Sequence, residues 1–323
     1  MHETIIKRPP WRVTFDGSFW HHSAGARSGQ VLPLEKTFSW AGRKWYLPAA
    51  YLCGQGLVLD LCMEAEAEAV RTFLQKWESK ECSTSELDML LMDAEHPLHV
   101  NWTPQITVNG KALAYQRGHG ATWFPGRERN GQEARWLLDH YGLDPEKGWS
   151  IHRYCFPWAT KRRPRRLSSL SLTLEPGMTL FPGPQFTVHQ AGDRVALPHP
   201  LTGVEHTLTV VEYEVQETDD NFFQDDAMEY PRHYTALTYH LDPDLPQEAI
   251  TLHDCRSSDR PRLKDPDPMA PQVSPGIALF TLDKEDPALH GGLSSLTFQP
   301  REEVLWQVIF QEKRHKALTL SLL

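Results

Sequence analysis

The chain has 323 residues, with 33 Lys and Arg against 42 Asp and Glu, so its formal net charge at pH 7 is −9. A charge of this sign repels polyanions and argues against nucleic acid as a partner. No apolar stretch approaches the roughly 20 residues of a membrane span, and residues 1–11 lack the hydrophobic region of a signal peptide. These features predict a soluble, cytoplasmic protein with no membrane partner.

The cysteine and proline contents predict a protein of short strands without a metal site. The 25 prolines are spread along the chain and disfavour long helices. No C-x-x-C pair suggests zinc or redox exchange. We therefore expect reduced, structural thiols, no metal and no cofactor; the five cysteines are Cys53, Cys62, Cys82, Cys155 and Cys255.

The first elements in chain order are strands. Apolar and polar residues alternate from Trp11 to Asp16, as in a half-buried strand. Aromatic segments at 38–40 and 44–47 flank Ala41-Gly42-Arg43 and predict a hairpin. The run 57–62 is apolar except for Asp60, which predicts a strand buried on both faces.

Helical signals are confined to the next hundred residues. Apolar residues recur every four positions from Glu64 to Lys80. Ser83-x-x-Glu86 resembles a capping box that opens a second helix, and Asn130 is a candidate cap for a third, over 131–141, that ends at Gly142. Between them, Asn109-Gly110 predicts a type I′ hairpin turn that places Ile106 opposite Leu113.

Strand patterns dominate the remainder of the chain. Leu170, Leu172 and Leu174 alternate with polar residues, and the apolar parity slips within 206–215, which predicts a β-bulge. Further strands are expected at 293–298, 304–311 and 317–322. The fold class is therefore mainly β, either all-β or β-dominated α+β, built of antiparallel β-sandwich or barrel domains. We predict two domains: residues 1–160, mixed with two or three helices, and residues 161–323, a sandwich or barrel.

The motifs of several enzyme classes are missing from the sequence. Gly54-Gln55-Gly56 precedes a predicted strand instead of following one, so it does not fit a dinucleotide-binding turn. The chain has no phosphate-binding loop, no G-x-S-x-G elbow and no H-E-x-x-H pair. Sequence motifs therefore leave open whether the protein is an enzyme.

Two groups of residues are candidates for ligand binding. His21, His22 and Arg27 lie in a stretch of small residues whose backbone amides could bind an anion, although such a stretch also suits an ordinary surface connection. Adjacent histidines on an extended chain point to opposite faces, which disfavours a shared metal. The 11 tryptophans, Trp123 among them, could stack on sugar rings or form the core of a sandwich.

Histidines and a cysteine in the second half are candidates for catalysis. His199 and His206 flank a predicted turn and could approach each other to bind a metal or carry a proton, or they could be structural residues at strand ends. His253 and Cys255 share a strand face, as a thiol and its base would, yet a half-buried cysteine without a role has the same pattern.

A basic run, Lys161-Arg162-Arg163-Pro164-Arg165-Arg166, fits a phosphate-contacting patch or a solvated linker. With the net charge negative, we favour the linker. The function expected from the sequence is a binding or assembly module that recognises an unidentified protein or carbohydrate. The alternative is a hydrolase or isomerase with a dispersed histidine-containing site. Oligomeric state is left open.

Overall fold

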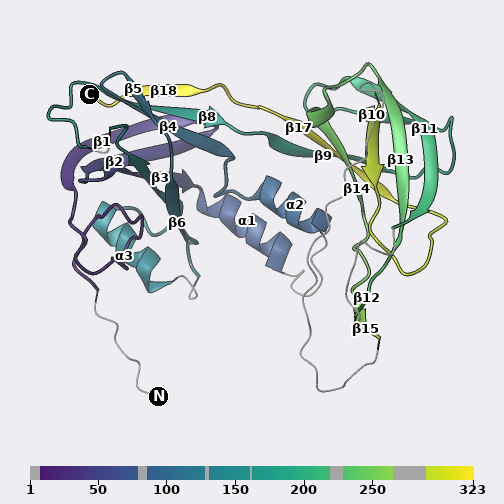
Figure 1. Ribbon diagram of the computed structural model, residues 1–323, viewed down its shortest axis with the longest axis horizontal. Coiled ribbons are helices and arrows are strands. Elements are labelled where there is room, and N and C mark those ends of the chain that lie inside the picture. Colours follow the sequence, from purple (N-terminus) through teal and green to yellow (C-terminus); the bar gives the residue numbers. More distant parts are fainter. Residues whose placement is uncertain (1–7, 79–85, 128–130, 161, 219–227, 265–288) are drawn as a thin grey trace. The chain divides into compact units, whose positions relative to one another are not determined.

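The computed structural model describes residues 8–78, 86–127, 131–160, 162–218, 228–264 and 289–323. Strands dominate, the strands within the described residues pair antiparallel, and the helices lie in the N-terminal half (Figure 1), which confirms the predicted fold class. Among the described residues, no sheet closes into a barrel. None of the described helices is long and apolar enough to cross a membrane.

Contacts divide the chain into two compact units, described separately below. The first contains Met1–Lys80, Glu95–Met178 and Lys313–Leu323, and the second contains Glu81–Ala94 and Thr179–Glu312. Contact units are not a test of independent folding. The division into domains at residue 160 therefore stays a prediction.

The first unit is a sandwich of two sheets. One sheet has the order β1-β2-β3-β7-β6 and the other β18-β8-β4-β5. Their facing side chains form one core around Trp45, Leu59, Ile106 and Leu172. The strands are β1 (Gln30–Trp40), β2 (Arg43–Leu52), β3 (Gly56–Ala65), β4 (Trp102–Val108), β5 (Lys111–Leu113), β6 (Arg117–Trp123), β7 (Gly148–Pro157), β8 (Leu170–Pro176) and β18 (Leu318–Ser321).

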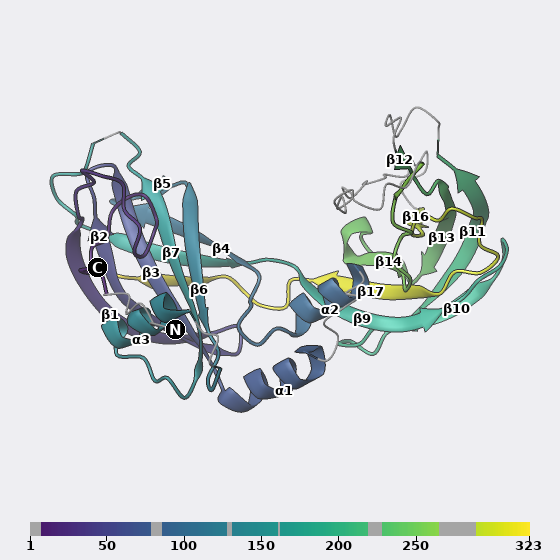
Figure 2. The same cartoon turned by 90° about the horizontal axis from the view of Figure 1, so that it is seen from below.

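Helix α3 (Gln132–Tyr141) covers the other face of the five-stranded sheet (Figure 2). Its Trp136, Leu137 and Leu138 share a core with Cys62 and Ile151 of that sheet. It ends at Gly142, whose φ of 64° is the left-handed value that glycine tolerates, as predicted. The predicted cap Asn130 lies outside the described residues.

Helix α1 (Ala67–Glu78) begins later than the predicted Glu64, because Glu64 and Ala65 still belong to β3. Its Val70 packs against Ala65 and Leu98. Helix α2 (Glu86–Glu95) occupies the position predicted for the second helix, but the proposed capping residue Ser83 lies outside the described residues.

Two predicted hairpins are confirmed by the register of their strands. Trp40 pairs with Arg43 around Ala41-Gly42, and Ile106 pairs with Leu113 around Asn109-Gly110. All four turn residues have positive φ, as a type I′ turn requires. The predicted strand at Trp11–Asp16 is wrong: this segment is irregular, and Val13, Thr14 and Phe15 are all buried, so no alternation of faces is present.

The second unit contains two sheets that share a core and a two-stranded ribbon, β12-β15, that contributes no residue to it. Their orders are β10-β11-β13-β16, β14-β17-β9 and β12-β15. Leu208 and Leu237 of the first sheet pack with Leu252 and Trp306 of the second. The predicted bulge is confirmed by a register shift at Val210/Glu212. Its strands are β9 (Thr179–Phe186), β10 (Arg194–Pro198), β11 (Glu205–Glu217), β12 (Met228–Glu229), β13 (His233–Asp242), β14 (Ile250–Asp254), β15 (Arg262–Leu263), β16 (His290–Leu293) and β17 (Trp306–Glu312).

Candidate functional site

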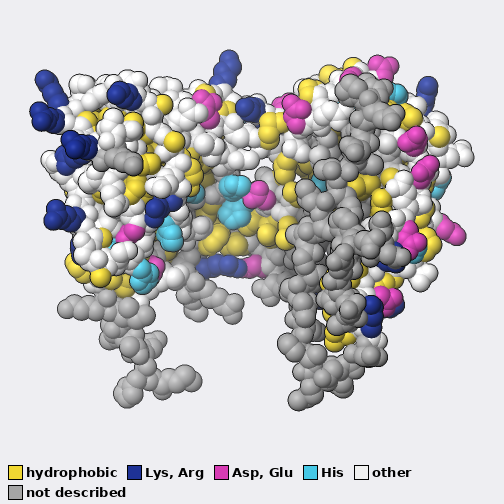
Figure 3. All heavy atoms as spheres, in the orientation of Figure 1, with side chains coloured by type: hydrophobic (Ala, Val, Ile, Leu, Met, Phe, Trp, Pro, Cys, Tyr) yellow, Lys and Arg dark blue, Asp and Glu magenta, His cyan; other side chains and the backbone are white. Residues whose placement is uncertain are grey.

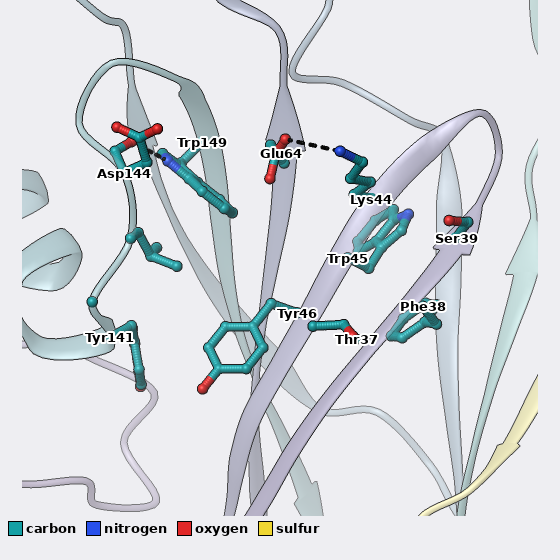
Figure 4. A pocket seen from close by; sticks show the side chains of 12 residues that line it. Thr37, Phe38, Ser39, Lys44, Trp45, Tyr46, Glu64, Tyr141, Asp144 and Trp149 are labelled. Atoms are coloured by element: carbon teal, nitrogen blue, oxygen red, sulfur yellow. Dashed lines mark hydrogen bonds and ion pairs between the residues drawn. The ribbon is translucent and has the colours of Figure 1, made fainter.

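A pocket of about 600 Å³ opens in the first unit, between the β1–β2 hairpin and the segment that follows α3 (Figure 4). We call it the hairpin pocket. Four strands, the last residue of α3 and the connection after it supply its walls, so it depends on the tertiary fold and not on a single motif. Its lining residues are Thr37, Phe38, Ser39, Lys44, Trp45, Tyr46, Glu64, Tyr141, Gly142, Leu143, Asp144 and Trp149.

Two tryptophans among the lining residues are fixed by hydrogen bonds to backbone carbonyls. Trp45 is buried and donates its indole N–H to the Trp40 carbonyl at 3.0 Å. Trp149 is buried and donates to the Asp144 carbonyl at 2.7 Å, which fixes the connection after α3. Phe38 stacks on Trp45 with ring centroids 6.1 Å apart. The indole N–H groups are therefore used by the fold. Trp149 shares the α3 side of the sheet with Tyr46, whereas the Trp45 and Phe38 rings face the core between the two sheets.

The aromatic ring that a ligand can reach on the α3 side of the sheet is that of Tyr46, which is half-buried; Phe38 points to the other face of the sheet, together with Trp45. In Figure 4 the Tyr46 ring projects into the space between β2 and the Tyr141 segment. Burial, assisted by the charge of Glu35, raises the pKa of the Tyr46 phenol. Tyr46 therefore stays protonated at neutral pH and presents both an aromatic face and a hydrogen-bond donor.

A carboxylate between two ammonium groups forms the charged side of the hairpin pocket. Glu64 accepts a short hydrogen bond from Lys147 and lies 3.8 Å from the Lys44 ammonium. The hydrogen bond to Glu64 raises the pKa of Lys147. Since Glu64 is at the end of β3 and Lys44 is its partner in the β2–β3 register, the sheet itself sets this arrangement. Such a group offers donors and an acceptor to a polar ligand.

The pocket wall is connected to a buried ion pair on the same face of the sheet. Asp60 and Arg153 have completely buried side chains and pair through two hydrogen bonds of 2.8 Å. Tyr141, which lines the hairpin pocket, donates a short hydrogen bond to Asp60. Burial lowers the pKa of Arg153, but the Asp60 carboxylate reverses this and raises it overall. With no exposed surface, this pair stabilises the site and does not contact ligand.

The structure separates the candidate binding residues of the N-terminal half. His21 is exposed and bonds Glu133 at 3.0 Å, whereas His22 bonds Thr14 at 3.0 Å, so the two rings do not converge. Arg27 is exposed. Trp123 is buried, and its indole N–H donates to the Pro145 carbonyl at 2.9 Å. None of these residues lines the hairpin pocket.

The structure brings His199 and His206 together in the core of the second unit. Their ring centroids are 6.3 Å apart, and His199 lies over Phe310. The Nδ1 atom of His199 accepts from the Leu201 amide at 3.3 Å, and His206 Nδ1 donates to the Pro243 carbonyl at 2.6 Å. Both rings are buried and bonded to backbone groups, as residues that fix turns are.

His253 and Cys255 lie on one face of β14 and its continuation, as the sequence predicts. Burial, followed by the charge of Asp254, raises the pKa of the Cys255 thiol. A catalytic cysteine requires the opposite shift. In the part of the chain that the structure describes, no group of three or more His, Cys, Asp or Glu is placed to hold a metal ion.

The sequence signals for the hairpin pocket were partial. The aromatic hairpin was predicted, but the approach of the 141–149 segment depends on packing of α3 and has no local signal. Comparisons with the families of known proteins, with curated proteins and with solved structures found no match to this chain.

Proposed function

We propose that the protein is a binding module that holds a carbohydrate in the hairpin pocket. The observation that carries this proposal is the combination, in one pocket, of the half-buried ring of Tyr46 with the charged group Glu64–Lys44. Sugar recognition needs an aromatic ring against the apolar C–H face of the sugar. It also needs a few placed polar groups for the hydroxyls.

The pocket supplies both requirements from a rigid frame. Tyr46 offers a ring and a phenol, and the exposed Thr37 and Ser39 add hydroxyls along the adjacent strand β1. Glu64 is held by its lysine partners, so its carboxylate is oriented before a ligand arrives. Preorganised groups reduce the entropy cost of binding, which favours recognition of a small polar ligand.

The alternative function, a hydrolase or isomerase with a histidine-containing site, has less support. His199 and His206 are buried and bonded to backbone groups, and the Cys255 thiol has a raised pKa. The test of this alternative is mutation of His199, His206, His253 and Cys255 with a panel of hydrolase and isomerase substrates. If the native protein binds no sugar and has an activity that these variants lose, the enzyme is favoured.

The experiment for the proposal is a glycan array followed by titration calorimetry on the best ligand. Tyr46→Ala should weaken binding at least tenfold, because stacking and the phenol are lost together, whereas Tyr46→Phe should lose less because the ring remains. Glu64→Gln should weaken binding, and Glu175→Gln on the other sheet of the sandwich is the matched control. An empty array with folded protein, or equal loss in Glu64→Gln and Glu175→Gln, would overturn the proposal.

A protein ligand at the same pocket is a distinct outcome of this test. It would appear as an empty array together with capture of one partner that the Tyr46→Ala variant fails to bind. We also propose a cytoplasmic location, which the free thiols of Cys53, Cys62, Cys155 and Cys255 support. Cell fractionation with an antibody to the protein tests that location.

A further inference from the structure

The net charge of −9 is an average over two units of opposite charge. The sequence positions of the first unit contain 25 Lys and Arg against 15 Asp and Glu, a formal charge of +10. Those of the second contain 8 against 27, a formal charge of −19. The net charge therefore says nothing against binding of a polyanion by the first unit, since attraction depends on the local field.

Basic residues from three separate segments meet at one end of the first unit. Arg163 donates to the side-chain oxygen of Gln30, where β1 begins, at 2.6 Å, and it approaches the carbonyl of Leu52, where β2 ends. The Asn109 amide donates to the Arg166 carbonyl at 2.8 Å, which links the β4–β5 turn to the same place. We call this the arginine-rich end; its residues are Arg12, Arg27, Lys111, Arg117, Arg162, Arg163, Arg165 and Arg166.

The charges at the arginine-rich end are not neutralised by carboxylates. Several basic residues elsewhere in the unit are paired, among them Arg71 with Glu68, Arg135 with Asp139 and Lys76 with Glu95. Within the described ranges, no residue of the arginine-rich end forms an ion pair; Arg12 and Arg163 donate to neutral oxygens. Seven of the eight residues of the arginine-rich end lie at positions 17–34, 96–127 or 147–174. The sequence has no Asp or Glu in these three ranges.

The space-filling view agrees with this separation of charge. In Figure 3, Lys and Arg side chains gather at the upper left, over the region where Figure 1 places β1 and β5, and no Asp or Glu appears among them on this face. Unpaired guanidinium groups present several N–H donors in a planar fork, which matches the oxygens of a phosphate.

An exposed aromatic ring lies close to two of these charges in the sequence. Tyr115 is 45% exposed and is located between Lys111 and Arg117 in the sequence. Its ring packs edge-on against Tyr154 and Phe156, with centroids 5.4 and 6.3 Å away. These contacts fix the ring while leaving surface free, as in the stacking platforms of proteins that bind unpaired bases.

We propose that the arginine-rich end of the first unit binds single-stranded nucleic acid, with guanidinium groups on the phosphates and Tyr115 stacked on a base. Stacking requires an unpaired base, so the ring favours a single strand over a duplex. This site is separate from the hairpin pocket, and the proposal goes beyond carbohydrate binding.

The test is fluorescence anisotropy of a labelled 20-nucleotide oligo-dT with the full chain at 50 to 200 mM salt. For single strands, the logarithm of the affinity falls with the logarithm of salt by about 0.7 per neutralised phosphate. Arg162→Ser/Arg165→Ser should therefore weaken binding and reduce the steepness of this slope by about 1.4. Arg71→Ser/Arg135→Ser removes the same charge from paired residues of the same unit and should leave the slope unchanged.

Tyr115→Ala should weaken binding of the single strand by roughly fivefold or more, since stacking on one base is lost, and should not change binding of a duplex of the same length. Circular dichroism confirms that each variant is folded. No binding of oligo-dT at 50 mM salt, or equal losses in the two double variants, would overturn the proposal. Stronger binding of poly-glutamate than of oligo-dT would also overturn it and assign the surface to an acidic protein.

Discussion

The buried pair Asp60–Arg153 should be the most sensitive point of the first unit. Asp60→Asn removes the negative charge at nearly constant volume and leaves the Arg153 guanidinium buried without a counter-ion. In the native protein, Arg153 also donates to the Ser18 carbonyl at 2.6 Å, which ties the N-terminal segment to the sheet. The pair therefore connects two elements that no strand pairing joins.

The expected cost follows from the complete burial of both side chains. Removing one member of such a pair costs about 3–5 kcal/mol, a large part of the roughly 5–15 kcal/mol that stabilises a typical domain. Arg153→Met, which keeps the apolar stem beside Trp11 and Phe19, should cost a similar amount. The double variant should be destabilised by less than the sum, because neither charge is then left alone; the coupling should be about 1–3 kcal/mol.

The assay is urea unfolding monitored by tryptophan fluorescence. Trp11 and Trp20 lie in the same unit, with their ring centroids 5.2 Å apart, and report on its unfolding. The exposed i,i+4 pair Arg135–Asp139 is the matched control, and Asp139→Asn should cost less than about 0.5 kcal/mol. If Asp60→Asn costs no more than Asp139→Asn, or if the two buried substitutions are simply additive, the reasoning is refuted.

Two further substitutions test the packing and the protonation of the first unit. Burial, with a smaller effect of His99, lowers the pKa of His152 to about 4. In the unfolded chain this imidazole takes up a proton near pH 6.5, whereas in the folded chain it does so only near pH 4. The free energy of unfolding should therefore fall by about 2–3 kcal/mol between pH 7 and 4.5. The His152→Gln variant lacks this group, so the stability derived from its urea midpoints should fall by that much less between pH 7 and 4.5 than the stability of the native protein. An equal fall in the two proteins would contradict the assignment. Gly56→Ala would place a Cβ 2.2 Å from the Phe15 ring and 2.3 Å from the Phe156 carbonyl oxygen, and should cost about 1–3 kcal/mol in the same urea assay. Gly54→Ala, which meets no atom within 4 Å, is its control, and similar costs for the two would disprove the packing argument.

Local sequence signals predicted those parts of the fold that are determined locally. The turns at Ala41-Gly42 and Asn109-Gly110 require positive φ, and their residues tolerate it. The strand β8 alternates buried and half-buried residues as its leucines indicate. The segment Trp11–Asp16 shows the limit of this approach: alternation describes side chains only, and whether a neighbouring strand supplies hydrogen bonds is decided by the rest of the chain.

The same limit explains why the site was only partly predictable. Asp60 stood out in the sequence as the one charge in an apolar strand, and a buried carboxylate requires a partner. The partner is Arg153, which the register of β3 and β7 places directly opposite, 93 residues away in the sequence. A register between distant strands is set by tertiary packing, so the need for a partner was visible in the sequence and its identity was not.

The two proposed binding sites can be tested independently because they lie at opposite ends of one sheet. Glu64 of the hairpin pocket is near the end of β3, whereas Gly56, where that strand begins, pairs with Pro157 next to the arginine-rich end. At 3.3 Å per residue, the eight intervening steps separate the two ends by about 26 Å. Screening at physiological salt acts over about 8 Å, so Glu64→Gln should leave oligo-dT affinity unchanged. A change of more than about twofold would mean that the two sites are coupled or that the ligands share one surface.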